Sequence, residues 1–395
     1  MSTNDTLHII TGATGFLGRS LVNRLLDDGE KICILIRNNG DDFKTRAEVI
    51  FPGYVVKYGN RFKVINGDIV KENLGISTEF LEEIKNAKIN LWHLAANLSF
   101  KCEHKEQIYQ DNVRGAKNVV NLVNTLSPES TLYYTSTAYI CGSKNKKCSE
   151  DETDRGQMPR NLYEKTKLIA EKIIKDNCKR KHIVFRPSII IGDAYEGKAV
   201  GCTFGYYRFT YVFYIFKKWA IAKLRYGGFW KKILELFGAV YESKIDKLKF
   251  SRLALPFPKN SQVNLIPIDF VIDSMVKISK ECQGNKTFHI VNINPPSFIF
   301  LFRELLDDLG MKGIKLIPVN PAVFNGIIKV CYFIFVPLRK YFESAIKYKP
   351  YITMRYEFST DNMRTLELTP TDISREDIKR INKYAIDSIF PNIKS

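Results

Sequence analysis

The sequence has few of the residue patterns that build metal centres or disulfide frameworks. It contains five histidines and eight cysteines, and no two cysteines form a Cys-x-x-Cys pair. Zinc sites and disulfide-stabilised domains need closely spaced ligands or pairs, so this spacing predicts neither and is typical of a reducing cytoplasm. We therefore expect no bound metal and a cytoplasmic location. The cysteines are Cys33, Cys102, Cys141, Cys148, Cys178, Cys202, Cys282 and Cys331.

The sequence also shows no long hydrophobic run and no visible secretion signal. The first apolar run, Leu7–Ile10, leads directly into a glycine motif. The most apolar later stretch, Phe324–Pro337, is interrupted by Lys329 and is shorter than the roughly 20 residues that cross a bilayer. The 395 residues, 45% of them hydrophobic, predict a large core domain with one or two additions.

Acidic residues are too few to balance the basic ones, and the formal net charge is +18. Residues 205–260 carry nine of these charges, with twelve Lys and Arg against three Asp and Glu, and they include fifteen aromatic residues. This mixture suits an anionic membrane surface or an acidic amphiphile. It also suits single-stranded nucleic acid, or an ordinary helical insertion with solvated lysines. We favour peripheral membrane contact, made together with Phe324–Phe342, over nucleic acid.

Short β-rich runs alternate with helical patterns over the first 190 residues. Such alternation predicts right-handed βαβ units and an α/β fold with a doubly wound, Rossmann-type parallel sheet. The predicted strands are Leu7–Thr11, Ile32–Ile36, Phe62–Asn66, Ile89–His93, Leu132–Ser136 and His182–Arg186, with later ones at Val263–Pro267 and Thr287–Asn292. The predicted helices are Gly15–Asp28, Glu79–Asn86, Glu106–Thr125 and Leu162–Asp176.

A glycine-rich turn follows the first predicted strand and opens the first predicted helix. Gly12 permits the tight turn, Gly15 lets the backbone approach a pyrophosphate, and Gly18 lets the helix pack close to the sheet. The helix N-terminus would bind the phosphates through its amides. A glycine triplet also occurs in turns without a ligand, but the strand-before, helix-after setting predicts a dinucleotide site. The expected contacts come from Gly12, Thr14, Gly15, Phe16, Leu17 and Gly18.

The end of the second predicted strand selects the nicotinamide cofactor. An acidic residue about 20 positions past the glycines would bond the ribose 2′-hydroxyl of NAD. Arg37 stands there instead, and a guanidinium suits the 2′-phosphate of NADP. Asp41 and Asp42 come slightly late for the NAD role, and Arg19 is placed to help from the helix start. The alternative to this phosphate contact is that Arg37 is only a surface residue at a strand end. We predict that the cofactor is NADPH.

Two further strand ends should meet the cofactor. Asp68 and Ile69 follow the third strand, where Asp68 is placed to bond the adenine amino group. Ala95 and Ala96 follow the fourth strand, where small residues let the ribose and pyrophosphate lie close. His93 is expected to be structural, because its strand position points it into the packing of the sheet.

Tyr163 and Lys167 lie at i and i+4 on one predicted helix face. In a lysine-rich chain this pattern also arises by chance, but here it opens a helix after the strand that ends in Ser136 and Thr137. Reduction of a carbonyl by hydride creates an oxyanion that must be bonded and protonated. We expect Tyr163 to donate the proton, Lys167 to lower its pKa and bond the nicotinamide ribose, and Thr137 to hold the carbonyl oxygen, with Ser136 as the alternative.

With these residues in place, the chain resembles the extended short-chain dehydrogenase/reductases over about residues 7–295. The resemblance also includes Asn112 and the segment Arg186–Asp193, in which Pro187 is the implied cofactor contact. Within that superfamily the chain is most similar to the fatty acyl-CoA reductase and thioester reductase branch. The segments that carry this similarity are His93–Phe100, Tyr134–Tyr139, Asn264–Val271, Phe288–Asn292 and, more loosely, Tyr351–Asn362.

The resemblance implies four parts in the chain. These are an NADP-binding core over 1–196, a mostly helical substrate or membrane insertion over 197–258, a return to the core over 259–295 and a helical C-terminal region over 296–395. It also implies a fatty acyl thioester, carried on CoA or on a separate acyl carrier protein, that is reduced to an aldehyde or alcohol.

Three other functions stay open. The first is a reductase of another hydrophobic ketone or aldehyde, such as a sterol or a secondary metabolite. The second is a nucleotide-sugar epimerase or dehydratase, against which Arg37 and the basic aromatic region argue. The third is an NADPH-binding sensor or scaffold, which would have little need for Thr137, Tyr163 and Lys167 together.

Overall fold

The computed structural model describes residues 6–38, 40, 42–100, 102–143, 147–334, 339–353, 355–370 and 372–393. The chain forms two compact units. The first contains residues 1–188, 268–291 and 356–370, and the second contains residues 189–267, 292–355 and 371–395. Residues 356–370 therefore return to the first unit late in the chain.

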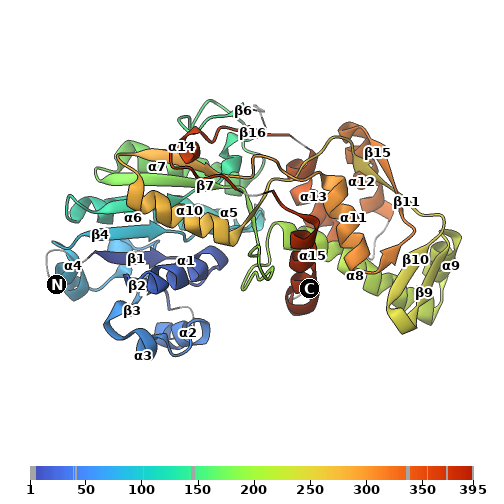
Figure 1. Cartoon of the computed structure of the whole chain (residues 1–395), viewed down its shortest axis with the longest axis horizontal. Coiled ribbons are helices and arrows are strands. Elements are labelled where there is room, and N and C mark those ends of the chain that lie inside the picture. The colour runs from blue at the N-terminus through green and yellow to red at the C-terminus, as the bar shows by residue number, and fades with distance from the viewer. Residues whose placement is uncertain are drawn as a thin grey trace. The chain divides into compact units, whose positions relative to one another are not determined.

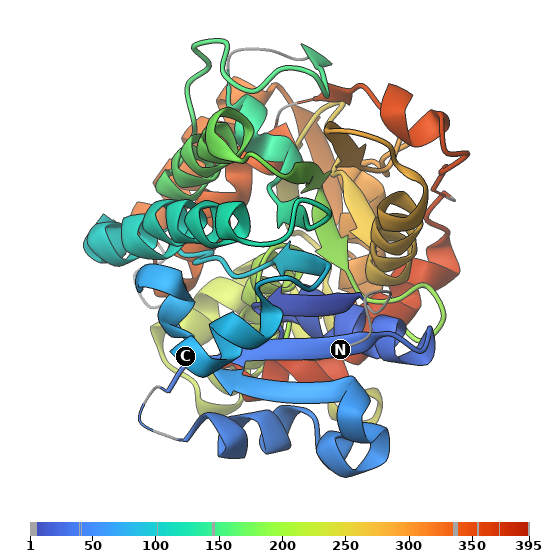
Figure 2. The same cartoon turned by 90° about the vertical axis from the view of Figure 1, so that its left-hand side faces the viewer.

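A seven-stranded parallel sheet forms the centre of the first unit (Figures 1 and 2). Its order is β13-β7-β5-β4-β1-β2-β3, the doubly wound arrangement that the sequence predicts. β1 and β4 are buried along almost their whole length, as expected for parallel strands covered on both faces. The strands are β1 Leu7–Thr11, β2 Lys31–Ile36, β3 Phe62–Asn66, β4 Ile89–His93, β5 Thr131–Thr135, β7 Lys181–Pro187 and β13 Lys286–Ile290.

Helices cover both faces of this sheet (Figure 2). α1 packs against α10, while α6 and α5 pack against α7. The apolar residues of α6 point inward and join a core cluster with β1, β4 and β5. The main helices are α1 Phe16–Asp27, α4 Thr78–Ile84, α5 Lys105–Tyr109, α6 Gly115–Thr125, α7 Leu162–Asn177 and α10 Ile268–Glu281, with the shorter α2 Phe43–Ile50, α3 Tyr54–Tyr58 and α14 Asp361–Arg364.

The predicted helix Glu106–Thr125 is divided by one π-helical turn, Gln110–Arg114. Asn112 lies in this turn and its amide donates to the carbonyl of Asn97 at 3.0 Å and to the Thr166 hydroxyl at 2.9 Å. The turn therefore ties the loop after β4 to α7. Single π turns inside helices are frequent at functional sites, and this one braces the helix that carries Tyr163.

The second unit is built mainly from helices (Figure 1). α8 packs against α13 and α9, and α11 packs against α15. The region predicted as mostly helical also contains three short strands that the sequence did not indicate, β9, β10 and β11. The helices are α8 Tyr206–Tyr226, α9 Phe229–Leu236, α11 Phe298–Asp308, α12 Pro321–Ile334, α13 Arg339–Thr353 and α15 Arg375–Tyr384.

Four small sheets complete the fold. In the second unit β8 pairs with β12, β11 with β15, and β10 with both β9 and β14; in the first unit β6 pairs with β16. The strands are β6 Lys147–Cys148, β8 Ile189–Ile191, β9 Ala239–Glu242, β10 Lys247–Phe250, β11 Ala254–Pro258, β12 Leu265–Pro267, β14 Met311–Lys312, β15 Lys315–Val319 and β16 Glu357–Phe358.

Of the fifteen aromatic residues of 205–260, five are buried, three are exposed and seven are of intermediate exposure. The buried residues form part of the core of the second unit: Tyr206, Tyr207, Tyr211, Phe250 and Phe257. The exposed residues are Tyr226, Phe229 and Phe237. In the stretch Phe324–Phe342, Phe324 is buried and residues 335–338 lie outside the described residues. Within the described part of the chain, no helix has the length and apolar character needed to span a membrane.

Candidate active site

Two glycines of the turn after β1 are required by the protein itself. Gly12 has a φ of +76°, and a Cβ there would lie 2.5 Å from the backbone nitrogen of Ala95. A Cβ on Gly18 would lie 2.2 Å from the Gly12 carbonyl oxygen. Any side chain at these positions would force the turn, the loop after β4 and α1 apart.

Gly15 is different, because the nearest protein atom to its Cβ would be 3.4 Å away, an ordinary contact. The protein therefore leaves room beside Gly15, where a ligand can approach the backbone. Gly15 is also the N-cap of α1 and provides no side-chain cap. The first-turn amides of Phe16, Leu17 and Gly18 have no acceptor within the helix, and they form the positive end of its dipole. These features fit a pyrophosphate.

Thr14 and Arg19 hold the turn in this shape, because the Arg19 Nε donates to the Thr14 carbonyl oxygen at 2.8 Å. The Nε of Arg19, expected as a helper for the cofactor phosphate, is thus committed to the turn. Arg37 follows β2 with 48% of its side chain exposed, and its guanidinium lies 3.9 Å from the Asp111 carboxylate. Its guanidinium remains accessible to an anion.

Asp42, the acidic residue near Arg37, has a local role. Its carboxylate caps α2 by accepting from the amides of Lys44 at 3.0 Å and Thr45 at 3.3 Å. Both bonds end on one oxygen, Oδ2, and this capping role accounts for an acidic residue near Arg37. Asp41, the other candidate, lies outside the described residues, as does Asn39.

Asp68 and Ile69 lie in the turn after β3. The Asp68 carboxylate accepts from the amide of Val70 at 3.2 Å, which shapes the turn and leaves its second oxygen available. The Ile69 side chain packs against Gly115 at the start of α6, and its carbonyl accepts from the Asn118 amide at 2.9 Å. These contacts hold Asp68 and Ile69 in place after the end of β3.

The loop after β4 continues this edge. The backbone nitrogen of Ala95 donates to the Thr11 hydroxyl at 3.4 Å, and Ala96 is half-buried beside it. His93 is fully buried, with its Nδ1 2.8 Å from the same hydroxyl. Burial, and to a lesser extent Lys167, lower the pKa of His93 to about 3, so the ring is neutral at physiological pH. Its contacts are structural.

Thr137 and Tyr163 meet at the carboxyl end of β5. Thr137 caps the 3-10 helix Ala138–Cys141 by accepting from the Tyr139 amide at 3.3 Å, and its side chain lies near enough to the Tyr163 phenol to oppose the rise in the pKa of that phenol. Tyr163 stands in the first turn of α7, whose N-cap Asn161 accepts from the Glu164 amide at 2.9 Å. The two side chains are therefore neighbours at the carboxyl end of β5.

Lys167 is one turn further along α7 and is buried. Its ammonium donates to the Thr135 carbonyl oxygen at 2.7 Å and lies 4.8 Å from the centre of the Tyr134 ring. Burial lowers the pKa of Lys167 to about 7, although Glu171 opposes this shift. Near pH 7 the Lys167 side chain is thus neutral in a substantial fraction of the molecules.

Burial raises the pKa of Tyr163 above its ordinary value, with Glu164 adding to the rise and the hydrogen bond from Thr137 opposing it. Lys167 does not contribute to the Tyr163 pKa in this structure, which differs from the expected lowering. The physical reason is that its ammonium is directed to the Thr135 carbonyl and is partly neutral.

Ser136, the alternative to Thr137, is buried, and its hydroxyl has no hydrogen-bond partner among the described residues. It is the smallest of the influences that lower the pKa of Glu171, a buried carboxylate. Burial raises that pKa, but the Arg186 guanidinium, 2.6 Å away, brings it down to about 2. Thr137 is the hydroxyl that acts on the Tyr163 pKa, and Ser136 remains the alternative contact for a substrate oxygen.

The Arg186–Glu171 pair is a central element that sequence reasoning did not identify. Both side chains are buried, and Arg186 also donates to the carbonyls of Ser149 at 2.9 Å and Glu152 at 2.6 Å. The pair fixes α7 to β7 one turn beyond Lys167. Pro187, the predicted cofactor contact, ends β7 next to Arg186 and aligns with Ile290 of β13. Arg186 was visible in the sequence, but nothing there marked Glu171 as its partner.

The predicted residues thus line one edge of the sheet in the first unit. In the order β5-β4-β1-β2, neighbouring strands carry Thr137, Ala95, the glycine turn and Arg37 at their carboxyl ends. β5 and β2 are three strands apart, about 14 Å at the usual strand spacing. An extended dinucleotide laid along this edge would reach from Arg37 to Tyr163.

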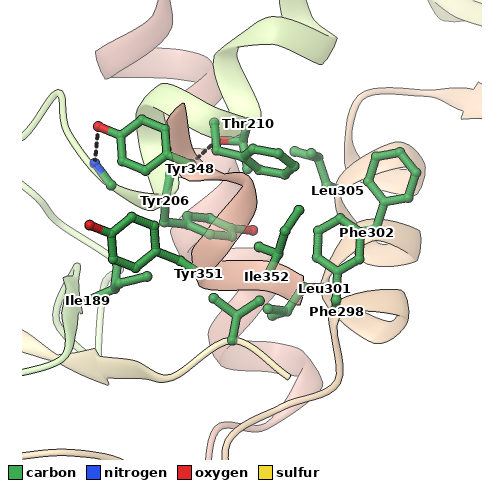
Figure 3. A pocket seen from close by; sticks show the side chains of 13 residues that line it. Ile189, Tyr206, Thr210, Phe298, Leu301, Phe302, Leu305, Tyr348, Tyr351 and Ile352 are labelled. Carbon is green, nitrogen blue, oxygen red and sulfur yellow. Dashed lines mark hydrogen bonds between the residues drawn. The ribbon is translucent and has the colours of Figure 1, made fainter. Parts of the chain in front are cut away.

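The second unit contains a separate apolar pocket, shown in Figure 3. Aromatic and aliphatic side chains from α8, α11 and α13 surround a cavity of about 30 Å³. Hydroxyl groups on its wall are used by the protein: Tyr206 donates to Asn382 at 2.6 Å, Thr210 donates to the Tyr206 carbonyl at 2.9 Å, and Tyr348 accepts from the Gly205 amide at 3.2 Å. The interior is therefore hydrocarbon. This pocket was not predicted from the sequence, because its lining comes from separate segments.

The fold and the residues at the sheet edge define an extended short-chain dehydrogenase/reductase with a site for a nicotinamide dinucleotide. More particularly, residues 10–224 match the NAD-binding family described as Male sterility protein, and the chain belongs to this family.

Known relatives agree with this assignment. The nonribosomal peptide synthetase asaC of Aspergillus flavus is 28% identical over 209 residues, which cover 48% of this chain and 20% of that protein. The fatty acyl-CoA reductase wat of Drosophila melanogaster is 28% identical over 220 residues, 46% of this chain and 42% of that protein. The chain thus spans less than half the length of these relatives.

A solved structure shares the whole fold. The terminal R domain from the myxalamid PKS-NRPS biosynthetic pathway superposes with a TM-score of 0.69 at 18% identity, covering 97% of this chain and 91% of that one. The similarity extends beyond the family match, into the second unit, and it supports the fold.

Proposed function

We propose that the protein is an NADPH-dependent reductase of acyl thioesters. The observation that carries this proposal is the Thr137–Tyr163 hydroxyl pair with Lys167 behind it, on the same sheet edge as the glycine turn. The two hydroxyls suit an oxygen that gains negative charge, which is what a carbonyl oxygen does during reduction. The relatives named as fatty acyl-CoA reductase and nonribosomal peptide synthetase make a thioester the favoured carbonyl.

The bound nicotinamide would supply the hydride for this reaction. Thr137 and Tyr163 would bond the carbonyl oxygen, and the Tyr163 phenol would protonate it as the carbon is reduced. The resulting hemithioacetal expels its thiol when the new hydroxyl loses its proton, which leaves an aldehyde. Protonated Lys167 would bond the ribose, and its charge would stabilise the Tyr163 phenolate that remains after the proton is donated.

NADPH is the proposed cofactor because of Arg37. Its guanidinium is accessible at the end of β2, where a 2′-phosphate would lie, and Asp42 is engaged as a helix cap. A bidentate guanidinium–phosphate contact is both stronger and more directional than a single charge. The room beside Gly15 and the uncapped start of α1 suit the pyrophosphate.

The apolar pocket of Figure 3 supports a substrate with a hydrocarbon chain. Ile189, on its wall, follows Pro187 by two residues in the sequence. The cavity of about 30 Å³ is small, and a chain would require side chains such as Leu301 and Leu305 to change rotamer. The thiol portion would be CoA or a separate carrier protein, and a hydrophobic ketone is the alternative substrate.

The test is NADPH oxidation followed by absorbance, with acyl-CoAs, aldehydes, ketones and a UDP-sugar as substrates. We expect turnover of acyl-CoAs with release of free thiol, measured with a thiol reagent. Turnover of ketones alone would assign the alternative substrate class. NADPH binding without turnover of any member of the panel would contradict the proposal.

A further inference from the structure

The junction of α8 and α9 places aromatic side chains in solvent. Tyr226 ends α8 with 87% of its surface exposed, and Phe229 begins α9 with 69% exposed. Between them Gly227 and Gly228 both have positive φ, and no protein atom lies within 4 Å of a Cβ built on either. Two large rings on an open glycine turn cannot be explained by packing within the unit.

The exposed face of α9 continues this surface. Phe229, Lys232 and Leu236 follow the i, i+3, i+7 spacing of one helix face, and Leu236 is 62% exposed. The opposite side of the helix supplies the packing, where Leu234 is buried and Trp230 contacts Trp219. One apolar side of α9 therefore packs in the core of the second unit, and a second apolar side is exposed to solvent.

The neighbouring β9–β10 hairpin adds aliphatic residues. Val240 on β9 and Ile245 in the connection between the strands are more than half exposed. We call the set Tyr226, Phe229, Leu236, Val240 and Ile245 the apolar tip. Single exposed apolar residues are ordinary, but several gathered on one helix–hairpin pair mark an interaction site.

The charges around the apolar tip are mostly positive. The three acidic residues of 205–260 each pair with a lysine of the same segment: Glu235 with Lys231, Glu242 with Lys249, and Asp246 with Lys217. Nine of the twelve basic residues remain without an acidic partner in the segment. Among them Arg225, Lys232, Lys244 and Arg252 are exposed around the apolar tip.

We propose that the apolar tip rests on the anionic surface of a phospholipid bilayer. Aromatic rings are favoured at the headgroup level, and basic side chains are attracted to anionic lipid within a Debye length. The aliphatic members decide against single-stranded nucleic acid, because Leu236, Val240 and Ile245 offer no ring on which a base can stack. Their burial in the acyl boundary removes apolar area from water.

The experiment is vesicle sedimentation of the full chain. Mixed phosphatidylserine–phosphatidylcholine vesicles are compared with pure phosphatidylcholine vesicles, at low and high salt. We expect binding to the anionic vesicles alone, reversed by salt. The Lys232→Gln/Lys244→Gln variant should bind these vesicles about 25-fold more weakly, about fivefold for each charge.

A second variant separates the apolar contribution from charge. Tyr226→Ser/Phe229→Ser leaves all charges in place and should lower vesicle binding at least about tenfold. The matched control is Val56→Ser, which changes an equally exposed apolar residue in the first unit. Thermal unfolding of each variant should equal that of the parent, because no substituted side chain is buried.

The results distinguish the possible partners. Failure of the parent to bind phosphatidylserine vesicles overturns the proposal, as does unchanged binding by Tyr226→Ser/Phe229→Ser. Binding of single-stranded DNA or an acidic carrier protein, without binding of vesicles, assigns the surface to that partner instead. None of these results depends on the thioester reductase activity, so the two proposals fail separately.

Discussion

At the scale of single residues, the phenol of Tyr163 has the most direct role. It lies beside the Thr137 side chain and stands apart from the glycine turn in the sequence and in the sheet. Tyr163→Phe should therefore reduce kcat by about a hundredfold or more while NADPH binding is preserved. Steady-state kinetics and a fluorescence titration with NADPH measure the two effects. Tyr109→Phe, at a partly exposed site, is the control; a Tyr163→Phe enzyme with parental kcat would assign the proton donor to another group.

Arg37 should determine the choice of cofactor. Arg37→Ala removes a charge-assisted contact and should weaken NADPH binding by about 1.5–3 kcal/mol, while NADH binding stays nearly constant. Competition titrations with both cofactors measure this difference. Equal affinity of the unaltered protein for NADPH and NADH would show that no 2′-phosphate contact is made.

Lys167 makes the stability of the protein depend on pH. Its pKa is about 7 in the folded chain, below its ordinary value of 10.5, so protonation penalises the folded state. The penalty is fully present below about pH 7 and disappears as the pH rises toward the ordinary value. Lys167→Met should therefore stabilise the protein by an amount on the order of 3 kcal/mol near pH 6, and less as the pH rises to 10.

Thermal unfolding across this pH range measures the effect. Lys165→Met, on the exposed side of the same helix, should show no such trend. A stability gain for Lys167→Met that does not change with pH would mean that the lysine is protonated in the folded protein throughout.

At the scale of helices and strands, α11 is the element to alter for substrate choice. Leu305 lines the apolar pocket, while Arg303 on the same helix is exposed. Leu305→Trp should fill the cavity and shift the preference toward shorter acyl chains, with kcat/KM for long chains falling tenfold or more as an order-of-magnitude expectation. Arg303→Trp is the control. Identical chain-length profiles for both variants would place the acyl chain outside this pocket.

The strands of the central sheet were predictable because each is a short, nearly continuous apolar run. β1, β3 and β4 have the predicted bounds, and β2, β5 and β7 differ by one residue at one or both ends. β9 and β10 were not predicted, because each spans only four residues; β10 alternates charged and apolar residues, but β9 does not. The π turn at Gln110–Arg114 was invisible because it preserves the helical apolar pattern around it.

The candidate site shows the same division between local and distant information. The glycine turn, Arg37, Thr137, Tyr163 and Lys167 are local motifs that the sequence displays at fixed offsets. Their electrostatic environment is not local, because the low pKa of Lys167 comes from burial by several elements. The partner of Arg186 and the residues of the apolar pocket likewise come from segments far apart in the chain.

At the scale of the whole molecule, the chain passes between the two units five times, after residues 188, 267, 291, 355 and 370. The last return brings β16 to β6 and delivers the Asn362 amide to the buried Glu150 carboxylate at 2.8 Å. A chain ending at residue 355 would lose both contacts and leave Glu150 with the His289 amide as its backbone donor.

We expect this truncated chain to unfold at a lower temperature than the full chain and to lose NADPH binding. Circular dichroism and calorimetric titration measure the two properties. Equal unfolding temperatures would show that residues 356–395 contribute little to the first unit. Loss of a backbone donor to a buried carboxylate alone should lower the stability by about 1–3 kcal/mol.

The five crossings also limit how such a protein can be recombined with its relatives. Neither unit is one continuous stretch of sequence, so a single exchange of segments between two relatives would combine incomplete halves of both. Residues 226–251, which carry the apolar tip, begin and end within one stretch of the second unit. Exchange of this short segment between relatives would therefore change the exposed surface while the sheet edge and the candidate site residues stay the same.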